Sequence, residues 1–267
     1  MKSPTVIEST SNGKVKKLVQ FQKKHKFREE HQAFIAEGSR LVSEVPTSWV
    51  IEVFVSESWL KKNIGHSIIK NHDYTVFSDT VFSHVSDTKS PQGIMALVKY
   101  PTYTLSDLIN MGSEVLLLLE GLQDPGNVGT IIRTAEAAGV KGVILSNTCV
   151  DLFNPKTVRS TMGSIFRMPV LYVEDWKPVF EAIKKVDRKI YATSLEDSAP
   201  YDSVNYGNGA AFLFGNEGQG LSKELLQMAD ARIKIPMKGQ VESLNVAVAA
   251  ALCVYEVMRQ KGGSLLL

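Results

Sequence analysis

The sequence predicts an α/β protein of two domains, a small N-terminal α/β domain followed by a C-terminal domain built on a parallel sheet. Its 267 residues suit one large domain or two modest ones. Short apolar runs alternate with helical patterns along the chain, as is typical of α/β folds. A segment rich in proline and hydroxyl residues at 99–112 interrupts this alternation. We therefore expect domains at 1–98 and 113–267, joined by a linker at 99–112.

The composition is that of a folded, soluble protein. Hydrophobic residues make up 44% and charged residues 22%, which argues against disordered, collagen-like and coiled-coil chains. Cys149 and Cys253 lie in apolar surroundings without C-x-x-C spacing, so we expect buried free thiols. The five histidines show no ligand spacing, and we expect no metal site. The N-terminus lacks a signal-peptide core and no stretch is long enough to cross a membrane, so a cytoplasmic protein without membrane contact is expected.

The charge is distributed unevenly along the chain. The net charge is only +2, but residues 1–40 hold nine basic and four acidic groups, a balance of +5 that leaves −3 for the remainder. A basic end suits contact with a phosphate backbone, although a solvated basic helix face is the commoner explanation of such a run. Charge alone leaves these two interpretations equally open.

The elements of the first half follow from local patterns. We expect a charged helix at 12–25, an apolar patch at 33–36 and a helix from Ser39, followed by strands at 51–55, 74–77 and 94–98. The second half contains five apolar runs, at 115–119, 142–145, 190–193, 211–214 and 232–235, with a helix between successive runs. Continuous apolar runs are typical of parallel strands covered on both faces. Ligands of such sheets bind beyond the carboxyl ends of the strands.

The first motif runs from Leu119 to Gly139 and places a turn and a helix after a buried strand. Asn127 is suited to cap the helix and Gly139 to end it. The apolar positions Val128, Ile131, Ile132, Ala135 and Ala138 form one stripe, so Arg133 should lie on the opposite side. Arg133 is either a solvated helix residue or, beside the small face of Thr130, Thr134 and Ala137, a group aimed at a phosphate or carboxylate.

The second motif is the glycine-rich segment from Phe212 to Ser222, directly after a predicted strand. Glycines there allow the backbone to approach a ligand closely. The segment is not a nucleotide-binding loop, because neither G-x-G-x-x-G nor G-x-x-x-x-G-K-[ST] occurs in the chain. A tight strand-to-helix turn without a ligand is the competing interpretation, with Glu217 favouring the start of the next helix.

The third motif runs from Ile235 to Leu252, with Ser243 as the expected N-cap of a helix through Met258. Residues 246–255 are apolar on all sides, so the helix must be covered all round. A second helix of the chain or a partner subunit would supply that cover. Together with the small face around Thr130, this predicts a homodimer.

These three motifs, in this order, resemble those of the SpoU/TrmH family of RNA 2′-O-ribose methyltransferases within the SPOUT class, over about 115–258. The resemblance implies a parallel sheet whose C-terminal chain forms a deep trefoil knot, an exception to the rule against knots. More weakly, the N-terminal half is similar to an RNA-binding substrate domain with the fold of a family of ribosomal proteins. The segments that carry this second likeness are 8–17, 28–40 and 90–93.

The resemblance also implies a set of site residues. S-adenosylmethionine would be the cofactor, without a metal. Its binding residues would be Thr193, Phe214, Gly215, Asn216, Gly220, Ile235, Met237, Ser243 and Leu244. The catalytic residues would be Arg133, Asn127, Glu217, Ser243 and Asn245. An arginine is effectively always protonated, so we expect Arg133 to bind the phosphate next to the reacting hydroxyl and lower that hydroxyl's pKa, rather than to remove its proton.

The sequence therefore predicts an S-adenosylmethionine-dependent enzyme that methylates a ribose 2′-hydroxyl in structured RNA, most simply 23S-type ribosomal RNA. Two alternatives remain, a transfer RNA 2′-O-methyltransferase and a non-catalytic RNA- or ribosome-binding protein on the same fold. A dinucleotide-dependent oxidoreductase fits the alternating strands but lacks the phosphate fingerprint.

Overall fold

A computed structural model describes residues 5–109, 115–207 and 209–262. The chain forms two compact units, one containing the residues up to 102 together with 151–166, the other residues from 103 to 150 and from 167 onward. Segment 151–166 belongs by sequence to the second half but packs with the first unit. Of the expected linker, residues 110–112 lie outside the described residues, and the boundaries at 98 and 112 stay predictions.

The first unit contains a mixed sheet of five strands in the order β1-β4-β3-β5-β2. These strands are β1 (Val6–Ile7), β2 (Ala33–Glu37), β3 (Val50–Ser56), β4 (Tyr74–Phe77) and β5 (Ile94–Lys99). β4 pairs with β1 and β3 in parallel, whereas β5 pairs with β3 and β2 antiparallel. The apolar patch at 33–36 is thus a fully buried strand, and the three strands expected in this half are present.

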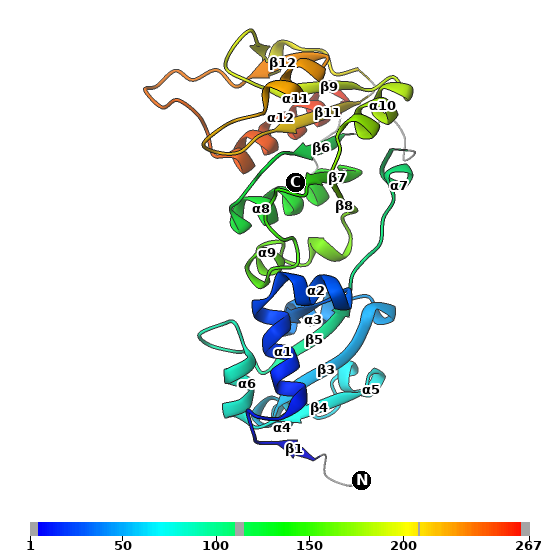
Figure 1. The fold of residues 1–267 in the computed structure, drawn as a ribbon, viewed down its shortest axis with the longest axis vertical. Helices are drawn as coiled ribbons and strands as arrows, with labels where there is room; N and C mark the ends of the chain where they lie inside the picture. The colour runs from blue at the N-terminus through cyan, green and yellow to red at the C-terminus, as the bar shows by residue number, and fades with distance from the viewer. Residues whose placement is uncertain (1–4, 110–114, 208, 263–267) are drawn as a thin grey trace. The chain divides into compact units, whose positions relative to one another are not determined.

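Short helices surround this sheet (Figure 1). They are α1 (Gly13–Lys23), α2 (His25–His31), α3 (Ser39–Glu44), η1 (Thr47–Trp49), α4 (Glu57–Lys62), α5 (Ser67–Asn71) and α6 (Asp79–Val85). α1 and α6 bury their apolar stripes in one core cluster with the sheet, to which Val15, Phe21, Phe54 and Phe82 contribute. The basic residues of α1, Lys16 and Lys17 among them, are left exposed.

Segment 151–166 completes the first unit with α9 (Pro155–Ser160) and η2 (Ser164–Phe166). α9 lies against β2, and the ring of Phe153 lies 4.8 Å from that of Phe34 and stacks on Tyr100 at 3.8 Å, measured between ring centroids. Asp151 accepts hydrogen bonds from Arg28 Nε, at 3.0 Å, and from Arg28 Nη2. Because both side chains are largely buried, this ion pair fixes the start of the segment to α2.

The second unit is built on seven strands in the order β10-β12-β9-β11-β6-β7-β8. They are β6 (Leu116–Leu119), β7 (Gly142–Ser146), β8 (Val170–Val173), β9 (Lys189–Thr193), β10 (Ala199–Pro200), β11 (Ala210–Phe214) and β12 (Ala231–Lys234). Every neighbouring pair is parallel, which confirms the predicted parallel sheet. β8 and β10, at the two edges, were not predicted.

Helices cover both faces of this sheet (Figure 1). They are α7 (Leu105–Ile109), α8 (Pro125–Ala137), α10 (Lys177–Lys185), η3 (Tyr201–Ser203), α11 (Lys223–Met228) and α12 (Val246–Gln260). α7, α10 and α11 share a core cluster with one face, through residues such as Leu118, Phe180 and Leu213. α8 and α12 pack against each other on the other face, where they contact β7 and β11 respectively.

Two predicted helix caps are wrong by two or three residues. α8 is capped by Asp124, whose Oδ1 accepts from the backbone N–H of Asn127 at 2.7 Å, so Asn127 lies inside the helix. α12 is capped by Asn245, whose Oδ1 accepts from the N–H of Ala247 at 2.9 Å, and not by Ser243. In both places two residues able to cap lie close together, and local sequence does not choose between them.

Candidate active site

The carboxyl ends of four neighbouring strands, β12, β9, β11 and β6, lie at one edge of the parallel sheet. The residues that follow them include Glu120 after β6, Gly215 after β11 and Ile235 after β12, while Thr193 ends β9. β11 is inserted between β9 and β6 although it comes later in the chain. Such a change of strand order opens a crevice for a ligand at this edge.

A cleft of about 760 Å³ occupies this edge, within the range of cofactor sites. The nine residues predicted to bind the cofactor all line it: Thr193, Phe214, Gly215, Asn216, Gly220, Ile235, Met237, Ser243 and Leu244. Glu217 and Asn245 line it as well. Sequence positions from 193 to 253 thus meet in one cavity.

The glycine-rich loop forms one wall of the cleft and is held tightly. A Cβ atom on Gly215 would lie 2.3 Å from the backbone carbon of Gly220, and Gly220 has a φ of +70°, so both positions require glycine. Asn216 Nδ2 donates to the carbonyl of Gly121 at 2.8 Å, and the N–H of Ser222 donates to Glu120 Oε2 at 2.8 Å. The loop is therefore anchored to the end of β6 at both of its ends.

Three of the predicted catalytic residues form a continuous hydrogen-bonded chain. Asn127 Nδ2 donates to Glu217 Oε1 at 2.8 Å, and Asn245 Nδ2 donates to Asn127 Oδ1 at 2.9 Å. These residues come from α8, the glycine-rich loop and the cap of α12. The cap of α12 orients the Asn245 side chain, whose Oδ1 accepts from the N–H of Ala247, and the cap of α8 fixes the backbone of Asn127. The Glu217 side chain is held by its bond from Asn127.

Arg133 and Ser243 do not join that chain. Arg133 lies on the exposed side of α8, as predicted, and outside the lining of the cleft. It follows Asn127 by six residues, which places it about 9 Å further along the helix axis and on a different side. It makes no hydrogen bond or ion pair with the described residues, so its guanidinium is available to an external anion. Ser243 lines the cleft at its exposed mouth.

The cleft has the chemistry that S-adenosylmethionine needs. Its apolar lining, including Phe214, Leu226, Ile233 and Val246, suits an adenine ring, whereas backbone amides and carbonyls of the loop and Glu217 supply polar partners. Cys253 also lines the cleft, and burial raises the pKa of its thiol to about 12, so the thiol is not a nucleophile near neutral pH. Cys149, half-buried, donates to the carbonyl of Leu119 at 3.2 Å.

Sequence reasoning missed two residues that organise the site, Glu120 and Asp124. Glu120 accepts a hydrogen bond from the backbone N–H of Ser222. Asp124 caps α8 by accepting one from the backbone N–H of Asn127. A signal was present for Asp124, because an aspartate directly before a proline is typical of an N-cap followed by the first helical residue.

The described residues contain neither a metal-ligand cluster nor a membrane helix. Within 5–109, 115–207 and 209–262, no group of three His, Cys, Asp or Glu side chains is arranged to hold a metal ion. In the same ranges no helix has both the length and the apolar character that a membrane span requires.

The parallel sheet, the cleft at its carboxyl ends and the three motifs around that cleft are those expected of a methyltransferase. The family model described as "SpoU rRNA Methylase family" matches residues 114–255. A second model, described as "MRM3-like substrate binding domain", matches residues 12–96. The chain belongs to the SpoU rRNA methylase family.

One curated relative is the 23S rRNA (guanosine(2553)-2′-O)-methyltransferase RlmP of Bacillus subtilis, which is 37% identical over 94% of this chain and 98% of its own length. Among solved structures, an AdoMet-bound rRNA methyltransferase from Sinorhizobium meliloti superposes with a TM-score of 0.83 at 30% identity, covering 96% of this chain and 97% of that one. A structure named RNA 2′-O ribose methyltransferase gives a TM-score of 0.80 at 29% identity, covering 96% and 99%.

Proposed function

We propose that this protein transfers a methyl group from S-adenosylmethionine to a ribose 2′-hydroxyl in 23S-type ribosomal RNA. The observation that carries the proposal is the cleft whose lining contains every predicted cofactor residue, with the Asn127–Glu217–Asn245 chain at its side. The similarity over nearly the full length to RlmP, a 23S rRNA 2′-O-methyltransferase, supports the choice of RNA. When bound, S-adenosylmethionine supplies a methyl group made electrophilic by its sulfonium.

The residues of the chain would align the two reactants and lower the pKa of the acceptor. A ribose hydroxyl is a weak nucleophile, and attack on a methyl carbon requires an in-line approach. The bonded chain of Asn127, Glu217 and Asn245 fixes polar groups beside the cleft, where they can orient the ribose. Arg133 would bind the adjacent phosphate, and its positive charge would favour the ionised hydroxyl. The proton would leave through that phosphate or water.

The protein is further proposed to act as a homodimer in the cytoplasm, with its C-terminal chain threaded into a trefoil knot. Support for the dimer comes from α12, where Val248 is 48% and Tyr255 is 38% exposed although the helix is largely apolar. The same stripe includes the half-buried Leu252. An uncovered apolar stripe of this kind is typical of an interface with another chain.

Methyl transfer to unmodified RNA tests the proposed activity. The full-length protein would be incubated with S-adenosylmethionine that is labelled in the methyl group. The RNA would be 23S rRNA or tRNA purified from cells that lack this protein. We expect label in 23S rRNA as one 2′-O-methylnucleoside, identified by mass spectrometry, and the position matching guanosine 2553 is the first to map. Label in tRNA alone would replace the proposed substrate, and binding of S-adenosylmethionine without product in either RNA would support the non-catalytic alternative.

A further inference from the structure

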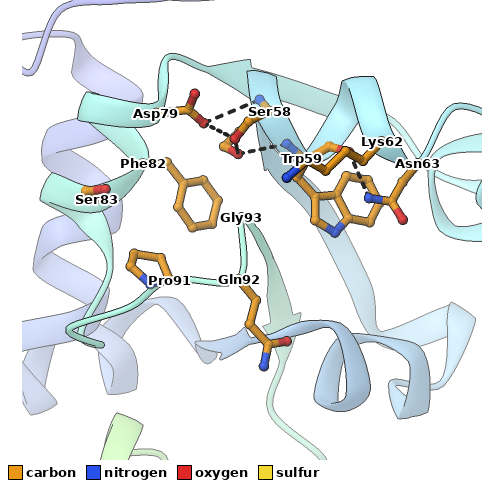
Figure 2. Close-up of a pocket in the computed structure, with 11 residues that line it drawn as sticks. Ser58, Trp59, Lys62, Asn63, Asp79, Phe82, Ser83, Pro91, Gln92 and Gly93 are labelled. Atoms are coloured by element: carbon orange, nitrogen blue, oxygen red, sulfur yellow. Dashed lines mark hydrogen bonds between the residues drawn. The ribbon is translucent and has the colours of Figure 1, made fainter.

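A second pocket lies in the first unit, between α4, α6 and the segment that precedes β5, with a volume of about 300 Å³. That volume is at the lower end of the range for ligand sites. Figure 2 shows the ring of Phe82 on one side and Trp59 on the other, with Gly93 between them and Asp79 beside Ser58. None of these residues takes part in the cleft of the second unit.

Asp79 provides a fixed acceptor at this pocket. Ser58 donates to Asp79 Oδ1 through its hydroxyl at 2.6 Å and through its backbone N–H at 3.3 Å. Both of these bonds end on Oδ1, the Ser56 hydroxyl is a further donor to the carboxylate, and Oδ2 retains a lone pair for a donor from a ligand. The hydrogen bond from the Ser58 hydroxyl lowers the pKa of Asp79 below its usual value, which keeps the group ionised at neutral pH. An ionised carboxylate only accepts hydrogen bonds, so a ligand must bring the donor.

Two aromatic side chains border the pocket from opposite sides. Phe82 is only 1% and Trp59 only 7% exposed, so their rings do not project as stacking platforms. Gly93 has a φ of +83°, and a Cβ atom there would lie 2.8 Å from both Ser56 Oγ and Trp59 Cβ. Glycine at this position therefore lets the backbone pass close to Ser56 and Trp59 without a clash.

The rim carries further polar groups. Gln92 Oε1 accepts from the N–H of Ser39 at 2.8 Å, which fixes the side-chain amide and leaves Nε2 as a donor. Asn63 Nδ2 donates to the carbonyl of Trp59 at 2.8 Å, which leaves Asn63 Oδ1 as an acceptor. Lys62 is exposed at the edge and carries a positive charge. The Asp79 carboxylate disfavours a phosphate inside the pocket, whereas this carboxylate and the polar rim suit the hydrogen-bonding edge of a nucleobase, whose phosphate would lie outside near Lys62.

We propose that this pocket binds one unpaired nucleotide of the RNA substrate, whose base carries an exocyclic amino group that donates to Asp79. Carboxylates accept hydrogen bonds from the amino group of cytosine, and proteins that read RNA sequence bind bases that are splayed out of helices. Uracil fits less well, because its carbonyl oxygens would face the carboxylate. The inference rests on the proposed function, since the ligand is part of the RNA that is methylated.

The substitution Asp79→Asn tests the inference by the sign of its effect. Asparagine keeps an acceptor for Ser58 but replaces Oδ2 with a donor, while it removes one negative charge. General electrostatics predicts tighter RNA binding after loss of a negative charge, whereas the pocket predicts weaker binding. We expect the Kd for a 23S rRNA transcript at constant salt to rise by about fivefold or more, with the affinity for S-adenosylmethionine unchanged. Glu30→Gln is the matched control, because it removes one negative charge at an exposed position of the first unit. This variant should not bind the RNA more weakly than the wild type.

A second measurement, made on the wild-type protein, does not depend on whether Asp79→Asn folds normally. Cytidine and uridine monophosphates would be titrated into isotopically labelled protein while the amide signals of Ser58 and Gly93 are followed by NMR. We expect cytidine monophosphate to shift them more than uridine monophosphate does, and Ser83→Trp, which narrows the pocket from α6, to abolish the difference. Equal shifts, or an Asp79→Asn variant that binds RNA as tightly as the wild type, would overturn the inference. Absence of methyl transfer by the wild type would instead count against the proposed function.

Discussion

Asn127 donates a hydrogen bond to Glu217 and accepts one from Asn245, so its side chain joins α8 to two segments that lie 90 and 118 residues further along the chain. At the scale of single residues, the identity of these side chains was predictable from the motifs and their resemblance to a family. Their contact was not, because it depends on the order of the strands and on both helix caps. Asp124 illustrates the limit, since either it or Asn127 satisfies the local requirement for a cap.

Substitution of Glu217 should separate its role in positioning from general loss of charge. Glu217→Ala removes the acceptor of Asn127 and should lower kcat/KM by about 10- to 150-fold, the range expected for a hydrogen bond to a charged group. Glu217→Gln retains an acceptor oxygen and should recover most of that loss. Glu224→Ala, on α11, removes one acidic residue without touching the chain of bonds and serves as the control. Equal activity of the alanine variant and the wild type would show that the bonded chain does not act in the reaction.

At the scale of elements, burial decides which strands the sequence reveals. β6, β7 and β11 are buried at every position, and each was predicted from a continuous apolar run. β10 was missed because its two residues, Ala199 and Pro200, are exposed and form no apolar run, whereas β8 was missed although its four half-buried residues are an apolar run as long as β6. α12 shows the converse, because its sequence is apolar all round while Val248 and Tyr255 remain uncovered. This exposed apolar stripe is the part of α12 for which the sequence pattern predicts cover by a partner subunit.

The substitution Val248→Asp should dissociate the proposed homodimer. Val248 is exposed in the single chain, so an aspartate there costs the fold little, but it would place a charge in a desolvated interface. Light scattering coupled to gel filtration should report a mass near twice 29.5 kDa for the wild type and near 29.5 kDa for the variant. Ile64→Asp makes the same kind of change at an exposed position in the first unit and should leave the mass unchanged. A wild-type mass of a single chain would refute the dimer.

At the scale of the whole molecule, the chain passes from the second unit into the first at 150–151 and returns at 166–167, in addition to its passage near residue 102. A division into two parts was predictable from the segment rich in proline and hydroxyl residues at 99–112, which interrupts the alternation of apolar runs and helical patterns. The exchange of segment 151–166 was not, because its residues look like an ordinary crossover between strands β7 and β8. What holds the segment is a long-range contact, the buried pair of Arg28 and Asp151.

Loss of Arg28 should therefore destabilise the first unit strongly. The guanidinium is 2% exposed, and besides Asp151 it donates to the carbonyl of Phe21 at 2.6 Å. Arg28→Ala leaves Asp151 as a largely buried charge without its cation, for which a loss of about 3–5 kcal/mol in the free energy of unfolding is typical. Arg40→Ala removes an exposed arginine whose pair with Glu44 spans 3.5 Å, and should cost about 1 kcal/mol or less.

Chemical denaturation of the full-length variants, followed by fluorescence, would measure both losses. Combining Arg28→Met with Asp151→Leu should recover most of the stability, because it removes both charges and keeps apolar volume at the site. The buried ion pair would then be a device that fixes where segment 151–166 attaches, more than a net source of stability. If Arg28→Ala proved no more destabilising than Arg40→Ala, the segment would have to be held by the stacked rings of Tyr100 and Phe153 instead.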